Sequence, residues 1–260
     1  MAESFTTVTE ATGCNVSREQ IKRMYTRYRF AAEQCPAGAQ ILEVACGSGQ
    51  GLGYLAKKAQ AVHAIDIDDA LLAAAKRHYA ATTKISIAKG DAHKLSFADA
   101  SLDAVLLYEA IYYLPHPEQF AAEAFRVLKK GGKLLICSAN SELPDFNPSP
   151  YSQKYFSASE LHKLMTDAGF AAVKLFANCR VDDSAKGKFL SAVKKTAVKL
   201  NLMPKTMRGK EWLKRVVFGS LVPLPAELDD GMADYDKPEP IAPGIPNTTH
   251  KVIFAVGEKS

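Results

Sequence analysis

The sequence lacks several features that would assign the protein to a particular class. No apolar run approaches the roughly 20 residues that a membrane-spanning helix needs. Residues 1–7 contain neither a basic segment nor an apolar core, so they do not resemble a signal peptide. The five cysteines form no C-x-x-C pair, which argues against a disulfide framework or a zinc site. With no H-E-x-x-H or clustered His/Asp spacing either, we expect a cytoplasmic protein without a bound metal.

The sequence also lacks the third glycine of the dinucleotide-binding fingerprint G-x-G-x-x-G. The apolar stretch Ile41–Cys46 ends in glycines at 47, 49 and 51, and position 52, where the third fingerprint glycine belongs, is leucine. This leucine disfavours an NAD-linked oxidoreductase. A strand that ends in a glycine turn and enters a helix nevertheless suits a nucleotide-like ligand. Glycine lets the backbone approach a ligand closely, and the helix offers unpaired N–H groups.

Charge is unevenly distributed along the chain. The net charge is +5, but residues 185–215 hold ten Lys or Arg and one Glu, a local +9. Residues 223–247 hold six acids and one Lys, a local −5. The basic segment has three interpretations: a solvated helix face, a site for an acidic or phosphorylated acceptor, or a peripheral contact with an anionic membrane surface. Nucleic acid is the weaker alternative, since no RNA-binding module or aromatic stacking platform is present. The oligomeric state is left open.

Strand-forming and helix-forming segments alternate along most of the chain. Strands are expected at residues 41–46, 61–65, 85–88, 103–108, 134–138, 172–177 and 250–256. Helices are expected at residues 17–32, 52–58, 69–79, 117–128 and 159–168. Ser17 and Gln20 have the spacing of a capping box for the first helix. Such alternation predicts an α/β protein with a mostly parallel sheet and right-handed crossovers.

Two acidic residues follow predicted strands. Asp66 lies 19 residues after Gly47, and an acid about 20 residues after a glycine turn can hydrogen-bond both ribose hydroxyls of a nucleotide. Asp91 follows the third strand and can accept a hydrogen bond from an exocyclic amine. The glycine turn, the ribose acid and the second acid together fit an adenosine.

Five motifs occur in a fixed order between Gln40 and Phe170. They are Glu43–Gly49, Ala64–Asp68, Lys89–Phe97, Ser101–Tyr108 and Arg126–Leu135, and a late helix segment at Lys154–Leu161 follows them. This series resembles class I S-adenosylmethionine-dependent methyltransferases of the small-molecule type. Ala45 is a departure, because the family usually has glycine there; altered packing rather than lost binding is expected. The resemblance implies a Rossmann-like, seven-stranded sheet of order 3-2-1-4-5-7-6 with strand 7 antiparallel and helices on both faces.

The resemblance implies S-adenosyl-L-methionine as the cofactor and S-adenosyl-L-homocysteine as its product. In this scheme Asp66 binds the ribose, Asp91 takes the adenine amine, and Tyr108 flanks the methyl donor. Core packing is the alternative for Tyr25 and Tyr28. The residues assigned to the cofactor are Tyr25, Tyr28, Glu43, Ala45, Gly47, Gly49, Asp66, Ile67, Asp91, Ala92 and Tyr108.

The same resemblance divides the chain and suggests its chemistry. Residues 1–177 and 250–260 are expected to form the methyltransferase domain, and 178–249 an inserted cap near the substrate end of the site. The expected reaction is methyl transfer to a small molecule, at a hydroxyl of a sugar or phosphate-bearing metabolite. Glu109, Tyr112 and His116 are candidate bases, with a pocket wall or a loop position as their alternatives. An RNA methyltransferase using residues 185–215 and a non-catalytic cofactor-binding protein are the competing functions.

Overall fold

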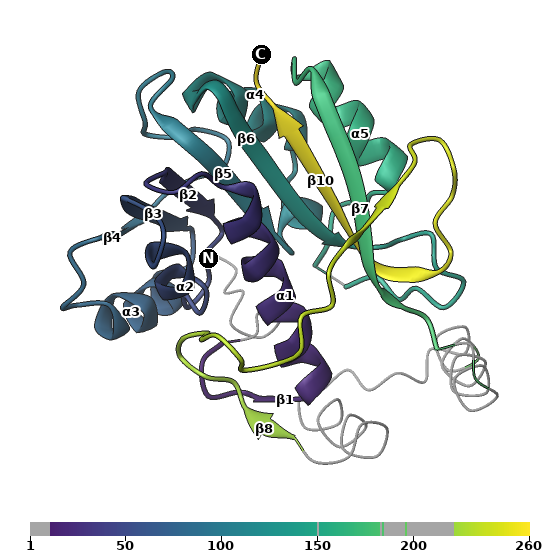
Figure 1. The fold of residues 1–260 in the computed structure, drawn as a ribbon, viewed down its shortest axis with the longest axis horizontal. Coiled ribbons are helices and arrows are strands. Elements are labelled where there is room, and N and C mark those ends of the chain that lie inside the picture. The colour runs from purple at the N-terminus through teal and green to yellow at the C-terminus, as the bar shows by residue number, and fades with distance from the viewer. Residues whose placement is uncertain (1–10, 150, 183, 185–195, 197–220) are drawn as a thin grey trace.

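The computed structural model describes residues 11–149, 151–182, 184, 196 and 221–260. An eight-stranded sheet runs through the molecule in the order β4-β3-β2-β5-β6-β10-β7-β9 (Figure 1). Its strands are β2 (Gln40–Val44), β3 (Ala61–Asp66), β4 (Ile85–Lys89), β5 (Leu102–Tyr108), β6 (Leu128–Ala139), β7 (Ala172–Arg180), β9 (Glu239–Ile241) and β10 (His250–Glu258). The predicted order of the first seven strands is confirmed, and β10 is antiparallel to both neighbours as expected.

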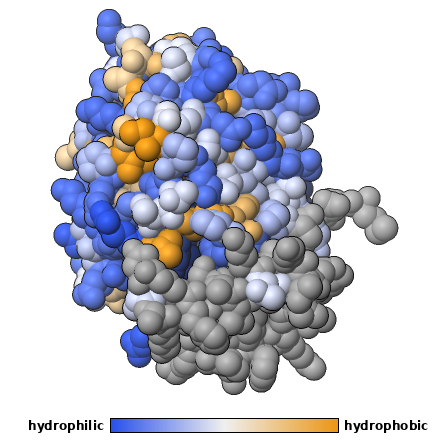
Figure 2. All heavy atoms as spheres, turned by 90° about the vertical axis from the view of Figure 1, so that its right-hand side faces the viewer, coloured by the Kyte–Doolittle hydropathy of each residue, from blue (hydrophilic) through white to orange (hydrophobic). Residues whose placement is uncertain are grey.

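The expectation of seven strands is wrong by one. β9 pairs antiparallel with β7 and closes that edge of the sheet. It is short and contains Pro240, which offers no N–H to a further strand, so the new edge is a poor template for association. Figure 2 shows the side of the molecule that carries this edge, where apolar side chains form small areas between hydrophilic ones.

Helices cover both faces of the sheet, as predicted. They are α1 (Arg18–Gln34), α2 (Leu52–Ala56), α3 (Asp69–His78), the 3-10 turn η2 (Ile111–Tyr113), α4 (Pro117–Val127) and α5 (Ala158–Asp167). Leu106 of β5 packs in one core with side chains of α1–α3, whereas Leu107 packs in the other core with those of α4 and α5. A strand buried on both faces needs a continuous apolar run, which is what the sequence has there.

Capping residues fix where two of these helices begin. The Ser17 side chain accepts a hydrogen bond from the Gln20 N–H, and the Gln20 side chain accepts one from the Ser17 N–H, which confirms the predicted capping box of α1. Ser157 and Glu160 form the same arrangement at α5. No helix in the described part of the chain combines the length and the apolar character needed to cross a membrane.

Residues 221–235, here termed the strap, pack on the outside of the glycine turn and α2. In the strap, β8 (Val222–Pro223) pairs with β1 (Asn15–Val16). The Leu228 N–H donates to the Gln50 carbonyl at 2.9 Å, and Asp229 pairs with the ammonium group of Lys57 at 2.5 Å. Acidic side chains of the segment 223–247 therefore form ion pairs with basic side chains of the same protein, as Asp229 does with Lys57.

Two described parts of the segment 178–249, which was expected to form a cap near the substrate end, lie at different places. The strap lies against α2 and the glycine turn, and β9 pairs with β7. The basic segment 185–215 lies outside the described residues, apart from position 196. The division into 1–177 with 250–260 and an insert at 178–249 stays a prediction.

Arg126 holds the segment that follows β4 onto α4. Its guanidinium donates to the carbonyls of Leu95 and Phe97, each at 2.9 Å, and pairs with Glu123 and Asp99. Because this segment begins at Asp91, Arg126 also fixes the carboxyl edge of β4.

Replacing Arg126 with alanine should lower the free energy of unfolding by about 2 kcal/mol, since two backbone carbonyls and two carboxylates lose their donor. Urea unfolding measures this loss. Arg180→Ala is the matched control, because this exposed arginine pairs with Glu239 at the surface and should cost much less. Equal losses in the two variants would contradict the anchoring role.

Candidate functional site

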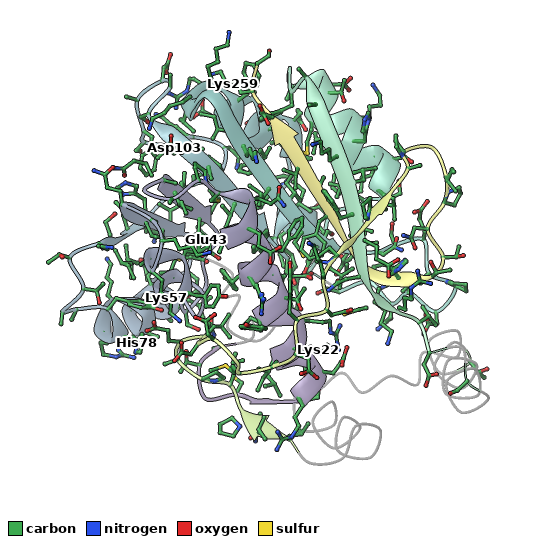
Figure 3. All side chains as sticks on the ribbon, viewed as in Figure 1. Lys22, Glu43, Lys57, His78, Asp103 and Lys259 are labelled. Carbon is green, nitrogen blue, oxygen red and sulfur yellow. The ribbon has the colours of Figure 1, made fainter. Side chains whose placement is uncertain are left out.

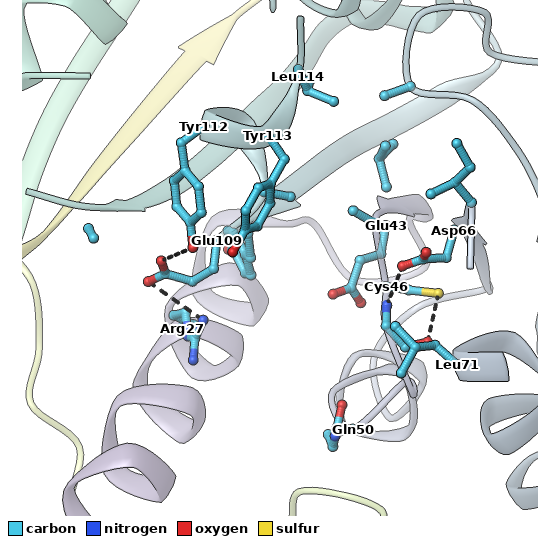
Figure 4. A pocket seen from close by; sticks show the side chains of 18 of the residues that line it. Arg27, Glu43, Cys46, Gln50, Asp66, Leu71, Glu109, Tyr112, Tyr113 and Leu114 are labelled. Carbon is cyan, nitrogen blue, oxygen red and sulfur yellow. Dashed lines mark hydrogen bonds and ion pairs between the residues drawn. The ribbon is translucent and has the colours of Figure 1, made fainter. Parts of the chain in front are cut away.

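A cavity of about 640 Å³ runs along the carboxyl edge of the parallel strands. Its floor is formed by the ends of β4, β3, β2, β5 and β6 and by the start of the antiparallel β10, and α1 forms one wall. Figure 4 shows the side chains that point into it. Most of the predicted site residues line this cavity: Tyr28, Glu43, Ala45, Gly47, Asp66, Ile67, Asp91, Ala92, Tyr108, Glu109 and Tyr112.

Three predicted site residues do not line the cavity. Tyr25 is 1% exposed and packs edge-on against Tyr54, on the side of α1 that faces α2, so the core-packing alternative describes its position. Gly49 lies within the turn, where an added Cβ would come 3.0 Å from Leu52. His116 sits at the start of α4 with 59% of its side chain exposed and pairs with Glu118 at 3.3 Å.

The glycine turn is tied to the end of β3 by one carboxylate. Asp66, labelled in Figure 4, accepts a hydrogen bond from the Gly47 N–H at 2.8 Å through one oxygen. Its other oxygen accepts from the Asp68 N–H at 2.9 Å. Burial raises the pKa of Asp66 above its usual value, while these two N–H groups lower it. The carboxylate of Asp66 is therefore fixed in one orientation at the cavity wall.

Position 45 is alanine where glycine was expected, and its backbone conformation is unusual for alanine. Ala45 has φ 58°, in the left-handed region that glycine occupies without strain. A non-glycine residue there costs about 1–2 kcal/mol. Gly47 follows two residues later with φ 57°, so the chain is left-handed at both positions although one of them is alanine.

Glu43 is a buried carboxyl at the centre of the cavity, and Figure 3 places it near the middle of the fold. One of its oxygens accepts a hydrogen bond from the Tyr28 hydroxyl at 2.5 Å. The other oxygen, Oε2, is buried and has no hydrogen-bond partner among the described residues. Burial raises the pKa of Glu43 to about 7. A buried, unsatisfied carboxylate oxygen is costly, so this position suits a ligand that brings a positive donor.

The β4 end of the cavity holds an apolar surface and an acid. Ile67 is 59% exposed, which is unusual for so large an apolar side chain beside a cavity. Asp91 accepts from the N–H of His93 at 2.9 Å and lies 2.7 Å from its Nδ1. These hydrogen bonds lower the pKa of Asp91. His93 lines the cavity and was not predicted; its place two residues after Asp91, in an Asx-type turn, is the signal that was available.

Glu109 lies at the tip of β5 in a strained conformation. Its φ is 52°, and its carboxylate accepts a hydrogen bond from the Tyr112 hydroxyl at 3.1 Å. The other carboxylate oxygen pairs with Arg27 of α1 at 3.7 Å, as the dashed lines in Figure 4 show. Burial, and then the neighbouring Glu109, raise the pKa of Tyr112, so this phenol stays protonated and acts as a donor. Strain of this kind concentrates at functional sites.

Cations at the cavity were also missed by the sequence reasoning. Arg23 and Arg27 line it from successive turns of α1, and Lys251 lines it from the start of β10. The i, i+4 spacing of the two arginines on a predicted helix was the available signal. Within the described ranges, no cluster of three or more His, Cys, Asp or Glu side chains is placed to hold a metal ion.

Comparison with known proteins identifies the central part of the chain. Residues 42–136 match a family model described as "Methyltransferase domain". A protein of Mycolicibacterium smegmatis, named "Probable S-adenosylmethionine-dependent methyltransferase", is 34% identical over 147 residues, which cover 55% of this chain and 56% of that protein. The phthiotriol/phenolphthiotriol dimycocerosates methyltransferase of Mycobacterium tuberculosis is 36% identical over 107 residues, 40% of this chain and 39% of that protein. The chain thus spans about half the length, or less, of these curated relatives.

Solved structures share the fold. Phosphoethanolamine N-methyltransferase 2 of Haemonchus contortus, in complex with S-adenosyl-L-methionine, superposes with a TM-score of 0.56. It is 16% identical in sequence, and the match covers 98% of this chain and 55% of that one. At this identity the likeness concerns the fold alone.

The raised pKa of Glu43 should make the stability of the protein depend on pH. Because the folded state holds this proton up to about pH 7 and the unfolded chain releases it near 4.5, stability falls as pH rises between these values. Relative to Glu43→Gln, the native protein should lose about 2–3 kcal/mol of unfolding free energy between pH 4 and pH 8. Urea unfolding of both proteins at each pH measures this difference.

The exposed Glu258 of β10 supplies the control for this experiment. Glu258→Gln should follow the native protein at both pH values, because that carboxyl is solvated. A Glu43→Gln protein whose stability tracks the native one across the range would show that Glu43 is not the titrating group.

Proposed function

Because this chain carries a class I S-adenosylmethionine-dependent methyltransferase domain, we propose that the protein transfers the methyl group of S-adenosylmethionine to a small molecule, at a hydroxyl oxygen. The observation that supports it best is the series Glu43, Asp66 and Asp91. These three acids stand at the ends of adjacent strands and line one cavity. Such a series suits a ligand that ends in an ammonium group, continues in a ribose and finishes in an aminated base.

The residues present fit that cofactor. Asp66 would accept from the ribose hydroxyls, and Asp91 from the adenine amine. Glu43 Oε2, which is buried and has no partner among the described residues, would take the ammonium of the methionine part. The exposed face of Ile67 would be covered by the adenine ring. When bound, the cofactor supplies an electrophilic methyl group for an in-line displacement, so positioning provides much of the acceleration.

Glu109 is our choice for the group that accepts the proton of the acceptor. Its carboxylate lines the cavity at the β5 tip and is oriented by Tyr112 and Arg27. Tyr112 is protonated and hydrogen-bonded to Glu109, which leaves it the role of an orienting donor. His116 does not line the cavity, and 59% of its side chain is exposed. A carboxylate held by two partners at this place can remove a hydroxyl proton during transfer.

The acceptor that we propose is a sugar or a phosphate-bearing metabolite. The Haemonchus protein of this fold is named for a phosphate-bearing acceptor, phosphoethanolamine. An RNA acceptor would depend on the basic segment 185–215, which lies outside the described residues. A non-catalytic cofactor-binding protein would have no need for a strained Glu109 with two orienting partners. The cytoplasm is the compartment that we propose, because all five cysteines are free.

Calorimetry should detect binding of S-adenosylhomocysteine, and Asp91→Ala should weaken it by about 10- to 100-fold, because a charged hydrogen-bond acceptor at the adenine end is lost. Asp69→Ala is the control. Asp69 is a neighbouring exposed acid that pairs with Lys89 outside the cavity, so its loss should leave the affinity unchanged. Binding of NADH in place of the homocysteine product would overturn the assignment.

Methyl transfer should depend on the Glu109 carboxylate. With labelled S-adenosylmethionine and a panel of hydroxyl-bearing metabolites, Glu109→Gln should reduce kcat by about 10²- to 10⁴-fold and leave product affinity intact. The exposed Glu118, which pairs with His116, provides Glu118→Gln as a control without effect.

Two results of this assay would exclude the proposal. Label in RNA but in no metabolite would favour the RNA methyltransferase. Product binding without transfer to any acceptor class would favour the non-catalytic alternative.

A further inference from the structure

The end of the cavity farthest from Asp91 carries an excess of positive charge. Arg23 and Arg27 of α1 and Lys251 of β10 line this end, and of the acidic side chains lining the cavity in the described structure, one, Glu109, stands with them. The other three acids lie at the ends of β2, β3 and β4, on the far side of β5 in the sheet order. The two ends of the cavity therefore have opposite charge.

Arg23 has an unsatisfied donor. Its Nε is buried and has no hydrogen-bond partner in the described part of the protein. A buried donor without a partner costs about 1–3 kcal/mol. Most buried polar groups in native proteins have a partner, so an exception calls for a cause such as a missing ligand. Arg23 lines the cavity, and a ligand there could accept from it.

Arg23 and Lys251 both lie close enough to Cys179 to affect the pKa of its thiol. Burial, Glu19 and Asp236 raise the pKa of the Cys179 thiol, whereas both cations lower it, so all four charged groups act near the end of β7. Glu19 contacts the Cys179 thiol at 3.8 Å and Asp236 accepts from the Cys179 N–H at 3.1 Å, but neither acid lines the cavity. Lys251 lies two strands beyond β5, whose tip carries Glu109, and Arg23 lies one helical turn before Arg27, the partner of Glu109.

The cofactor cannot neutralise this charge alone. Arg27 is offset by its pairing with Glu109 and by the nearby Glu43. Arg23 and Lys251 have no ion-pair partner in the described part of the chain, and Glu19 and Asp236, which act on Cys179 with them, do not line the cavity. The carboxylate of the methionine part can offset one of these two cations, so the other remains for the acceptor. A guanidinium and an ammonium group together match the oxygens of a phosphate, because Arg offers a planar fork of donors and Lys a compact charge.

We propose that Arg23 and Lys251 form the subsite that binds a phosphate group of the acceptor. The inference rests on the proposed function, since it assigns the cofactor to the Glu43–Asp66–Asp91 end and the acceptor to the other. The phosphate is held beyond Glu109, so the hydroxyl to be methylated lies between the phosphate and the cofactor.

Calorimetric titration of inorganic phosphate into the protein saturated with S-adenosylhomocysteine tests the subsite. Saturable binding is expected, and Arg23→Gln and Lys251→Gln should each weaken it by about 10- to 100-fold, as for the loss of one charged hydrogen bond. Lys22→Gln is the matched control, because Lys22 lies on the same helix and does not line the cavity (Figure 3). Neither cavity variant should lower the melting temperature, because neither residue has an ion pair to lose among the residues that the structure describes.

The outcomes separate the subsite from the proposed function. Phosphate affinity that is the same in the native protein, Arg23→Gln and Lys251→Gln would overturn the subsite, as would an equal effect of Lys22→Gln. Acetate that binds as tightly as phosphate would replace it by a carboxylate site. If S-adenosylhomocysteine fails to bind, the proposed function falls, and titration of the protein without it still decides whether these cations bind phosphate.

Discussion

The Asp66 carboxylate is the group on which the site depends. It joins the glycine turn after β2 to the turn after β3 through the N–H groups of Gly47 and Asp68. Parallel pairing of β2 with β3 brings these two turns to the same edge, and the carboxylate then fixes their separation. Without that tie, both turns would present unpaired N–H groups to the cavity, at the cost of buried polar groups. One side chain therefore holds together the two turns at the ligand-binding edge of the sheet.

Each glycine after β2 meets a different constraint. Gly47 adopts a left-handed φ and donates to Asp66. Gly51 has an ordinary φ of −95°, but an added Cβ would lie 1.9 Å from the Tyr28 ring. Tyr28 needs that space to reach Glu43, whose burial in turn depends on α1 covering the cavity. A pattern that looks like one glycine-rich turn therefore combines a backbone requirement with a packing requirement of the first helix.

The fold was largely predictable because its signals are local or periodic. The apolar run of β5, the capping box at Ser17 and the acids after β3 and β4 are each visible in a short window of sequence. The errors share a physical cause, which is that a side chain's direction depends on tertiary contacts. Tyr25 and Tyr28 are three residues apart on α1, yet one packs against Tyr54 and the other bonds Glu43. Arg23 and Arg27 can be assigned to the site only from the packing of α1 over the cavity.

The two ends of the cavity differ in charge, and this difference favours one orientation of the bound cofactor. The cofactor has a positive sulfonium and an ammonium group, and the acids at the ends of β2, β3 and β4 favour those charges at one end. The cations of α1 and β10 repel them at the other end and favour an anion there. Glu109 stands at the tip of β5, next to the cationic end, and pairs with Arg27 at 3.7 Å. The acidic strap pairs with cations such as Lys57 on the outer surface, and none of its side chains lines the cavity.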